Sequence, residues 1–122
     1  MDRRIFFILV AAAIAAMAGG VYSQLRAANT DSARQNFKEL CARCHGPEGF
    51  GDGPDGGPLA TKPRNFHDCG LMSKEADETM FNEIKGGSAS IGRSNDMPAW
   101  GEALGDDEIR DMIALIRTFC AH

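Results

Sequence analysis

The 122-residue sequence has few large aromatic side chains and no excess of positive charge. Phe, Tyr and Trp together make up 7% of it, so little bulk is available to fill a hydrophobic core. Acidic residues outnumber basic ones by 17 to 13, and the net charge of −4 argues against a nucleic-acid partner. The length excludes a multidomain enzyme. A domain this small commonly completes its core with a disulfide, a metal or a cofactor.

The sequence also lacks the alternation of apolar and polar residues that is typical of β-strands. Three segments instead show helical spacing of apolar residues, at 31–40, 73–85 and 106–120. Residues 46–61 are crowded with Gly and Pro, which predicts a long irregular loop. No Ser/His/Asp set, phosphate-binding loop or close carboxylate pair stands out, so we expect no enzyme. The prediction is a small all-α fold with three main helices and long loops.

The N-terminus carries an export signal. Arg3 and Arg4 precede an uncharged apolar stretch, and Ala16 and Ala18 supply the small residues that a signal peptidase requires. We expect 1–18 to be a cleaved signal peptide, 19–30 a linker and 31–122 the folded domain. The alternative is an uncleaved membrane anchor through residues 5–22, which is at the lower length limit for a bilayer span. Either way the domain lies outside the cytoplasm, in the periplasm.

The motif Cys41-Ala42-Arg43-Cys44-His45 carries the chemistry. C-x-x-C-H is typical of c-type haem attachment: the two thiols add to the two vinyl groups of one porphyrin, and the histidine becomes the proximal iron ligand. A thioredoxin-like redox pair would need a βαβ context, and a zinc site would need a second close cysteine pair. The sequence offers neither, so we expect one covalently bound haem c held by Cys41 and Cys44, with His45 on the iron.

The sixth iron ligand should come from a segment distant in sequence. Met97 is the best candidate because it lies in an irregular segment, where Pro98 restrains the backbone and limits the freedom lost on binding. His67 is the main rival. Three other methionines occupy positions typical of core packing or precede a helix: Met72, Met80 and Met112.

Cys69 and Cys120 remain once the haem motif is assigned. Two leftover cysteines in an exported protein suggest a disulfide, and we predict that these two residues pair. The alternative is two separate buried thiols.

Three basic residues in expected loops are candidates to bind the haem propionates: Lys62, Arg64 and Arg93. Exposed basic residues are, however, usually only solvated.

The sequence resembles the monohaem class I cytochromes c over residues 31–120. Ala33, Phe37 and Cys41 reproduce the four-residue steps by which a small residue and an aromatic precede the family's haem motif, and Met97-Pro98-Ala99-Trp100 is similar to its axial-methionine loop. The resemblance implies a cytochrome c-like fold around the haem, with Met97 as distal ligand and Trp100 packed nearby. It also implies a proline carbonyl bonded to His45, for which Pro54 and Pro58 both suit the spacing. Leu115 departs from the aromatic residue that is usual in the family's last helix.

Two axial ligands leave no open coordination position, so the sequence predicts a one-electron carrier that shuttles electrons between redox proteins. Removing residues 1–18 leaves 11 basic and 16 acidic residues, a charge of −5, which predicts a partner with a basic docking patch. One alternative is a haem-bearing subunit tethered to a membrane respiratory complex, with membrane contact only if the N-terminal segment is retained. Another is a haem enzyme or gas sensor in which Met97 is labile.

Overall fold

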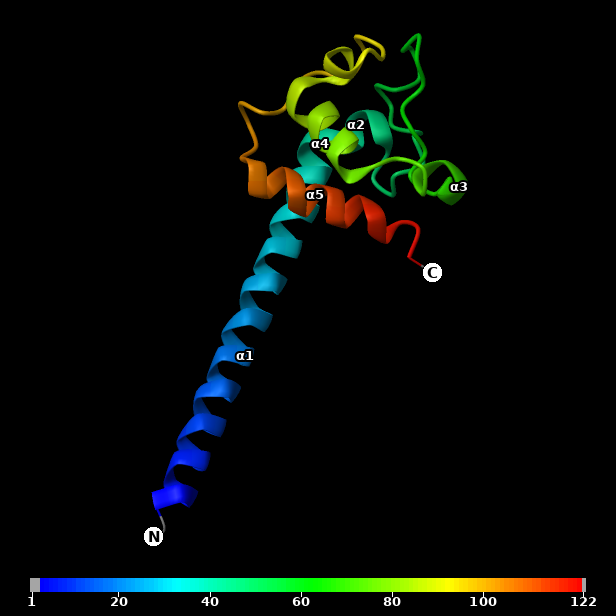
Figure 1. Cartoon of the computed structure of the whole chain (residues 1–122). Helices are drawn as coiled ribbons and strands as arrows, with labels where there is room; N and C mark the ends of the chain where they lie inside the picture. The colour runs from blue at the N-terminus through cyan, green and yellow to red at the C-terminus, as the bar shows by residue number, and fades with distance from the viewer. Residues whose placement is uncertain (1–2, 122) are drawn as a thin grey trace.

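The computed structural model describes residues 3–121, without the side chains of residues 25–28. Within that range the chain is helical and has no strand, which confirms the predicted all-α fold (Figure 1). Met1 and Asp2 of the expected signal peptide and His122 at the end of the expected domain lie outside the described residues. The elements in order are α1 (Arg3–Asn36), η1 (Phe37–Cys41), α2 (Ala42–His45), α3 (Cys69–Met72), α4 (Asp77–Gly86), η2 (Ser88–Ile91) and α5 (Asp106–Thr118).

Helix α1 is far longer than the sequence pattern predicts. It runs without a break through the expected linker at 19–30, so the expected helix start at residue 31 is wrong. The segment has no proline, the residue that most strongly breaks a helix, and the helix continues through it despite Gly19 and Gly20. In Figure 1 its blue part projects away from the rest of the chain, and its large apolar side chains from Ile5 to Tyr22 are exposed.

The C-terminal end of α1 packs across α5 (Figure 1). Ala33 and Phe37 face this crossing and are each 3% exposed, while Ile109 and Met112 of α5 are fully buried. The spacing of three and four residues in both segments places these side chains on single helical faces. The same stripes that identified the two helices in the sequence therefore make the core.

A five-residue π-helical turn, η1, separates α1 from the haem motif. The sequence gives no sign of it. Such turns occur often at functional sites, and this one ends on Cys41, the first cysteine of the motif.

The segment after α2 is irregular, as its Gly and Pro content predicts, and it folds back onto the motif through backbone hydrogen bonds from Gly51 to His45 and from Gly53 to Cys44. Gly51 has a φ of +78°, and a Cβ there would lie 2.5 Å from the carbonyl oxygen of Pro63. A Cβ on Gly53 would lie 2.4 Å from the carbonyl oxygen of Arg43. Only glycine fits such close backbone approaches, so these two positions allow the loop to pack against α2 and against the segment that precedes Phe66.

The second expected helix, 73–85, begins later than the sequence predicts. Residues 73–76 are irregular, and α4 begins at Asp77 and ends at Gly86. Before this link, α3 begins after Asp68, whose carboxylate accepts a hydrogen bond of 3.1 Å from the backbone N–H of Leu71. The expected start at residue 73 is therefore wrong, while the expected stop is confirmed: Gly87 adopts a φ of +79° directly after α4.

Candidate haem-binding site

One cavity gathers the residues that the sequence singled out for haem binding. Cys41, Cys44 and His45 of the α1–α2 region line it, and Met97 and Trp100 line it from the loop before α5. Most of its surface is apolar, with Phe37, Phe66, Met80, Ile84, Met112 and Ile116 among its walls. A flat apolar group held by two thiols, an imidazole and a thioether fits this combination of walls and donors.

His45 is oriented by a hydrogen bond on one ring nitrogen. Its Nδ1 lies 3.2 Å from the backbone carbonyl oxygen of Arg64, and its ring stacks on Phe66 with 4.6 Å between the ring centroids. When Nδ1 donates to this carbonyl, the lone pair is on Nε2, which is the arrangement an iron ligand requires. Burial lowers the pKa of His45 and favours the neutral imidazole. The expected partners, Pro54 and Pro58, are therefore wrong: the loop bends so that the residue after Pro63 supplies the acceptor.

Cys41 and Cys44 lie on the wall of the cavity and take part in no disulfide. Burial, with a smaller contribution from Cys44, raises the pKa of Cys41 to about 11. A catalytic redox cysteine has a lowered pKa, so this environment does not suit a thioredoxin-like pair. Among residues 3–121 no group of three or more His, Cys, Asp or Glu side chains could hold a bare metal ion, so no zinc site is formed there.

Three of the four methionines considered above line the cavity. Met97 is half-buried on a loop, and its carbonyl oxygen accepts a hydrogen bond of 3.2 Å from the N–H of Ser88. Met80 on α4 and Met112 on α5 are buried within helical stripes of the core, while Met72 is buried away from this cavity. Helical side chains already packed in the core are less free to reach an iron than a loop side chain.

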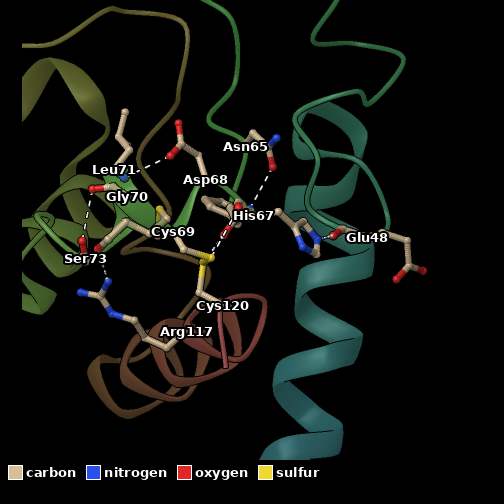
Figure 2. Close-up of a disulfide and its surroundings, with 12 residues drawn as sticks. Glu48, Asn65, His67, Asp68, Cys69, Gly70, Leu71, Ser73, Arg117 and Cys120 are labelled. Carbon is tan, nitrogen blue, oxygen red and sulfur yellow. Dashed lines mark hydrogen bonds between the residues drawn. A yellow bond between two sulfur atoms is a disulfide. The ribbon is translucent and has the colours of Figure 1, made fainter. Parts of the chain in front are cut away.

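The rival ligand His67 does not line the cavity. Its Nε2 lies 2.8 Å from the carbonyl oxygen of Glu48, and its ring stacks on Phe50 with centroids 4.1 Å apart. Figure 2 shows this ring directed toward Glu48, beside the cysteine pair. These contacts account for His67 without a role on the iron.

Comparison with known proteins agrees with this geometry. The family model "Cytochrome C oxidase, cbb3-type, subunit III" matches residues 28–116, which is most of the chain. The chain belongs to this family of c-type cytochromes. A solved structure, "KustC0563 c-type cytochrome", is similar with a TM-score of 0.60 and 24% identity, over 72% of this chain and 96% of that one. A search of curated proteins found no match.

The cofactor of this c-type cytochrome is covalently bound haem c, and its general role is electron transfer. The residues present suit that group, because the chain places a C-x-x-C-H motif and a methionine on one mainly apolar cavity. The similar solved structure supports the cytochrome c-like fold.

The cytochrome's candidate propionate ligands are engaged with other groups. Arg93 forms ion pairs of 2.9 Å with Glu75 and 2.8 Å with Glu83, and Arg64 forms one of 3.1 Å with Glu75. The hydrogen bonds that Arg93 donates to the carboxylate of Glu75 raise the pKa of Arg93. The third candidate, Lys62, donates to the carbonyl oxygen of Gly57. Sequence analysis missed both glutamates, since charged residues on or before a helix carry no signal of a distant partner.

The two cysteines outside the haem motif, Cys69 and Cys120, lie together just after the C-terminal end of α5 (Figure 2). The Sγ atoms of Cys69 and Cys120 face each other, and their Cα atoms are 5.5 Å apart, a separation that is usual for a disulfide. Beside them Arg117 donates to the carbonyl oxygen of Met72 at 2.6 Å and to the carboxylate of Asp77 at 2.6 Å. Both contacts fasten the α3–α4 region to the end of α5.

Proposed function

We propose that this cytochrome is an exported one-electron carrier of the periplasm, with one haem c bound through Cys41 and Cys44 and ligated by His45 and Met97. The observation that carries the proposal is the single cavity that these four residues line, although Met97 is separated from the motif by more than half of the mature domain. The bound haem supplies a reversible one-electron couple at its iron.

The chain's own residues prepare the site for that role. The carbonyl of Arg64 fixes the orientation of the His45 ring, and the hydrogen bond from Ser88 fixes the backbone of Met97. The apolar walls limit the access of water to the site, which restrains exchange of the iron ligands and tunes the reduction potential. If His45 and Met97 both bound the haem iron, no coordination position would remain for a substrate, so the arrangement would suit electron transfer rather than an enzymatic reaction.

The partners are redox proteins, and we propose that they dock through a basic patch. The domain without residues 1–18 carries a charge of −5, and the haem propionates add to it. Electrostatic docking raises the association rate and weakens as salt screens the charges. Transfer between this cytochrome and its partner should therefore slow as ionic strength rises.

A second candidate, a haem subunit tethered to a membrane respiratory complex, has two observations in its favour. The family description names a subunit of a cytochrome c oxidase. In addition, α1 contains an 18-residue window of mean hydropathy 2.3, none of which is buried. A signal sequence near the N-terminus has the same properties, so we propose the cleaved carrier first and the anchored form second.

Two measurements on native protein test the proposal. A reduced and an oxidised visible spectrum should show one covalent haem c and, in the ferric form, the weak red band that accompanies a methionine–iron bond. The absence of this band would favour the labile-ligand enzyme or gas sensor instead. Intact mass should show loss of residues 1–18 from a soluble cytochrome, whereas a membrane-bound form that retains them would establish the tethered subunit.

A further inference from the structure

We propose that Glu75 is a positioning residue that holds both segments carrying the axial ligands. The inference rests on the proposed function, because it takes His45 and Met97 as those ligands. Glu75 lies in the irregular link between α3 and α4, and its side chain is only 9% exposed. Sequence analysis assigned it no role.

On the proximal side, Glu75 acts through Arg64. Its carboxylate lies 3.1 Å from the guanidinium of Arg64, which is half-buried. The backbone carbonyl of the same Arg64 is the acceptor 3.2 Å from His45 Nδ1. Because one residue carries both groups, holding its side chain restrains the carbonyl that sets the orientation of the imidazole ring.

On the distal side, Glu75 acts through Arg93. Both of its carboxylate oxygens lie 2.9 Å from Nη2 of Arg93. The backbone N–H of Arg93 donates to the carbonyl of Ser88 at 2.9 Å, and the N–H of Ser88 donates to the carbonyl of Met97 at 3.2 Å. Two backbone hydrogen bonds thus join the arginine to the residue that presents the thioether.

The carboxylate is itself fixed in place. The backbone carbonyl of Glu75 accepts a hydrogen bond from the guanidinium of Arg117 on α5. A second carboxylate, Glu83 on α4, accepts from Arg93 at 2.8 Å and from the Ser88 hydroxyl at 2.5 Å. The cluster of Arg64, Arg93, Glu75 and Glu83 therefore balances two positive with two negative charges.

This cluster should hold the two ligand segments more firmly than ordinary surface ion pairs would. Its carboxylates are mostly shielded from water, and hydrogen bonds between two charged groups are stronger there than on an open surface. Among the described residues only Glu75 contacts both Arg64 and Arg93, so its loss loosens both ligand segments, while the loss of Arg93 loosens only the distal one. Without Glu75, Arg93 keeps its ion pair with Glu83, whereas Arg64 loses the carboxylate that it contacts in this cluster.

The test is Glu75→Gln in the holoprotein, which keeps the shape and removes the charge. Glu78→Gln, an exposed position three residues along, makes the same change of charge without touching the cluster. In Glu75→Gln we expect the ferric red band to vanish at a lower temperature than helix unfolding, and the His45 Nδ1 proton of the ferrous form to exchange faster with solvent. Where the band is intact, the reduction potential should rise, because unpaired positive charge favours the ferrous state.

The control should lose its band only with unfolding. If Glu75→Gln behaves like Glu78→Gln in band, exchange and potential, or lowers only the temperature of global unfolding, the inference is overturned. If Glu75→Gln does not accumulate, Arg93→Gln provides the test. We expect this variant to lose the red band at a lower temperature than it unfolds, with unchanged exchange of the His45 Nδ1 proton. If the band and the fold are lost together, the inference is overturned. A wild-type protein without the red band would instead refute the proposed Met97 ligation.

Discussion

His45 Nδ1 lies 3.2 Å from the carbonyl oxygen of Arg64, a residue placed by the glycine at position 51. Gly51 adopts a positive φ, and its backbone lies so close to the carbonyl oxygen of Pro63, the residue before Arg64, that no Cβ would fit between them. His45 and the glycine-rich loop are thus parts of one arrangement, in which the close approach of two backbone segments sets the position of the acceptor.

Gly51→Ala should disturb that arrangement. The new Cβ would lie 2.5 Å from a backbone oxygen at a φ of +78°, so we expect a loss of about 1–3 kcal/mol in the free energy of unfolding. Displacement of the 63–64 segment should also speed exchange of the His45 Nδ1 proton. Urea unfolding and proton NMR measure the two effects.

Gly57→Ala is the matched control for this change. Gly57 has an ordinary φ, and its nearest neighbour would lie 4.0 Å from the added Cβ. The control should leave stability within about 0.5 kcal/mol of wild type. Equal effects of the two substitutions would contradict the role assigned to residue 51.

The sequence predicts the helical class, the haem motif and the irregular loop because each depends on local chemistry. Periodic apolar residues on α5, the C-x-x-C-H spacing before Gly46 and the breakers of 46–61 all act within a few residues of one another. Helix boundaries were less predictable: residue 31 is no helix start, because the helix already runs through the segment before it, which has no proline.

The partners of the site residues could not be predicted in the same way. Whether Pro54, Pro58 or Arg64 faces His45 depends on the path of the loop, which close backbone approaches at Gly51 decide. The ion pairs of Glu75 likewise depend on how three loops meet. The spacing of residues in the sequence predicts neither the partner of His45 nor the ion pairs of Glu75. Both sets of contacts join segments that are far apart in the sequence, where no periodic pattern indicates which residues meet.

We predict that Cys69 and Cys120 form a disulfide that stabilises the domain. The chain-entropy model assigns a crosslink over a sequence separation of 51 about 4 kcal/mol. Alkylation of denatured holoprotein should label no thiol before reduction and two after it, since we propose that Cys41 and Cys44 are bound to haem. The double variant Cys69→Ser/Cys120→Ser should unfold at lower urea; unchanged stability, or two thiols labelled without reduction, would refute the prediction.

A further prediction concerns the stability that packing between α1 and α5 contributes. Ala33 is 3% exposed at this crossing, so Ala33→Leu adds bulk where no space remains and should cost about 1–3 kcal/mol of folding free energy. Ser32, one position earlier, is exposed, and Ser32→Leu should change stability by less than about 0.5 kcal/mol. Thermal unfolding of the two holoproteins compares them; a larger loss in Ser32→Leu would mean that α1 packs through another face.

The last prediction concerns which methionine binds the iron. Met80, Met97 and Met112 all line the cavity, but only Met97 comes from a loop, whereas the other two are buried on helices. Met97→Ala should abolish the ferric red band and lower the reduction potential, because loss of the thioether removes the ligand that favours the ferrous state.

Met80→Leu and Met112→Leu serve as its controls, since each replaces a thioether by a hydrocarbon of similar volume. Both should retain the band and lose less than about 1.5 kcal/mol of stability, as expected for core residues that only pack. If the band survives in Met97→Ala and disappears in either leucine variant, the ligand comes from the helical core, and the loop before Trp100 then serves to cover the cavity rather than to bind the iron.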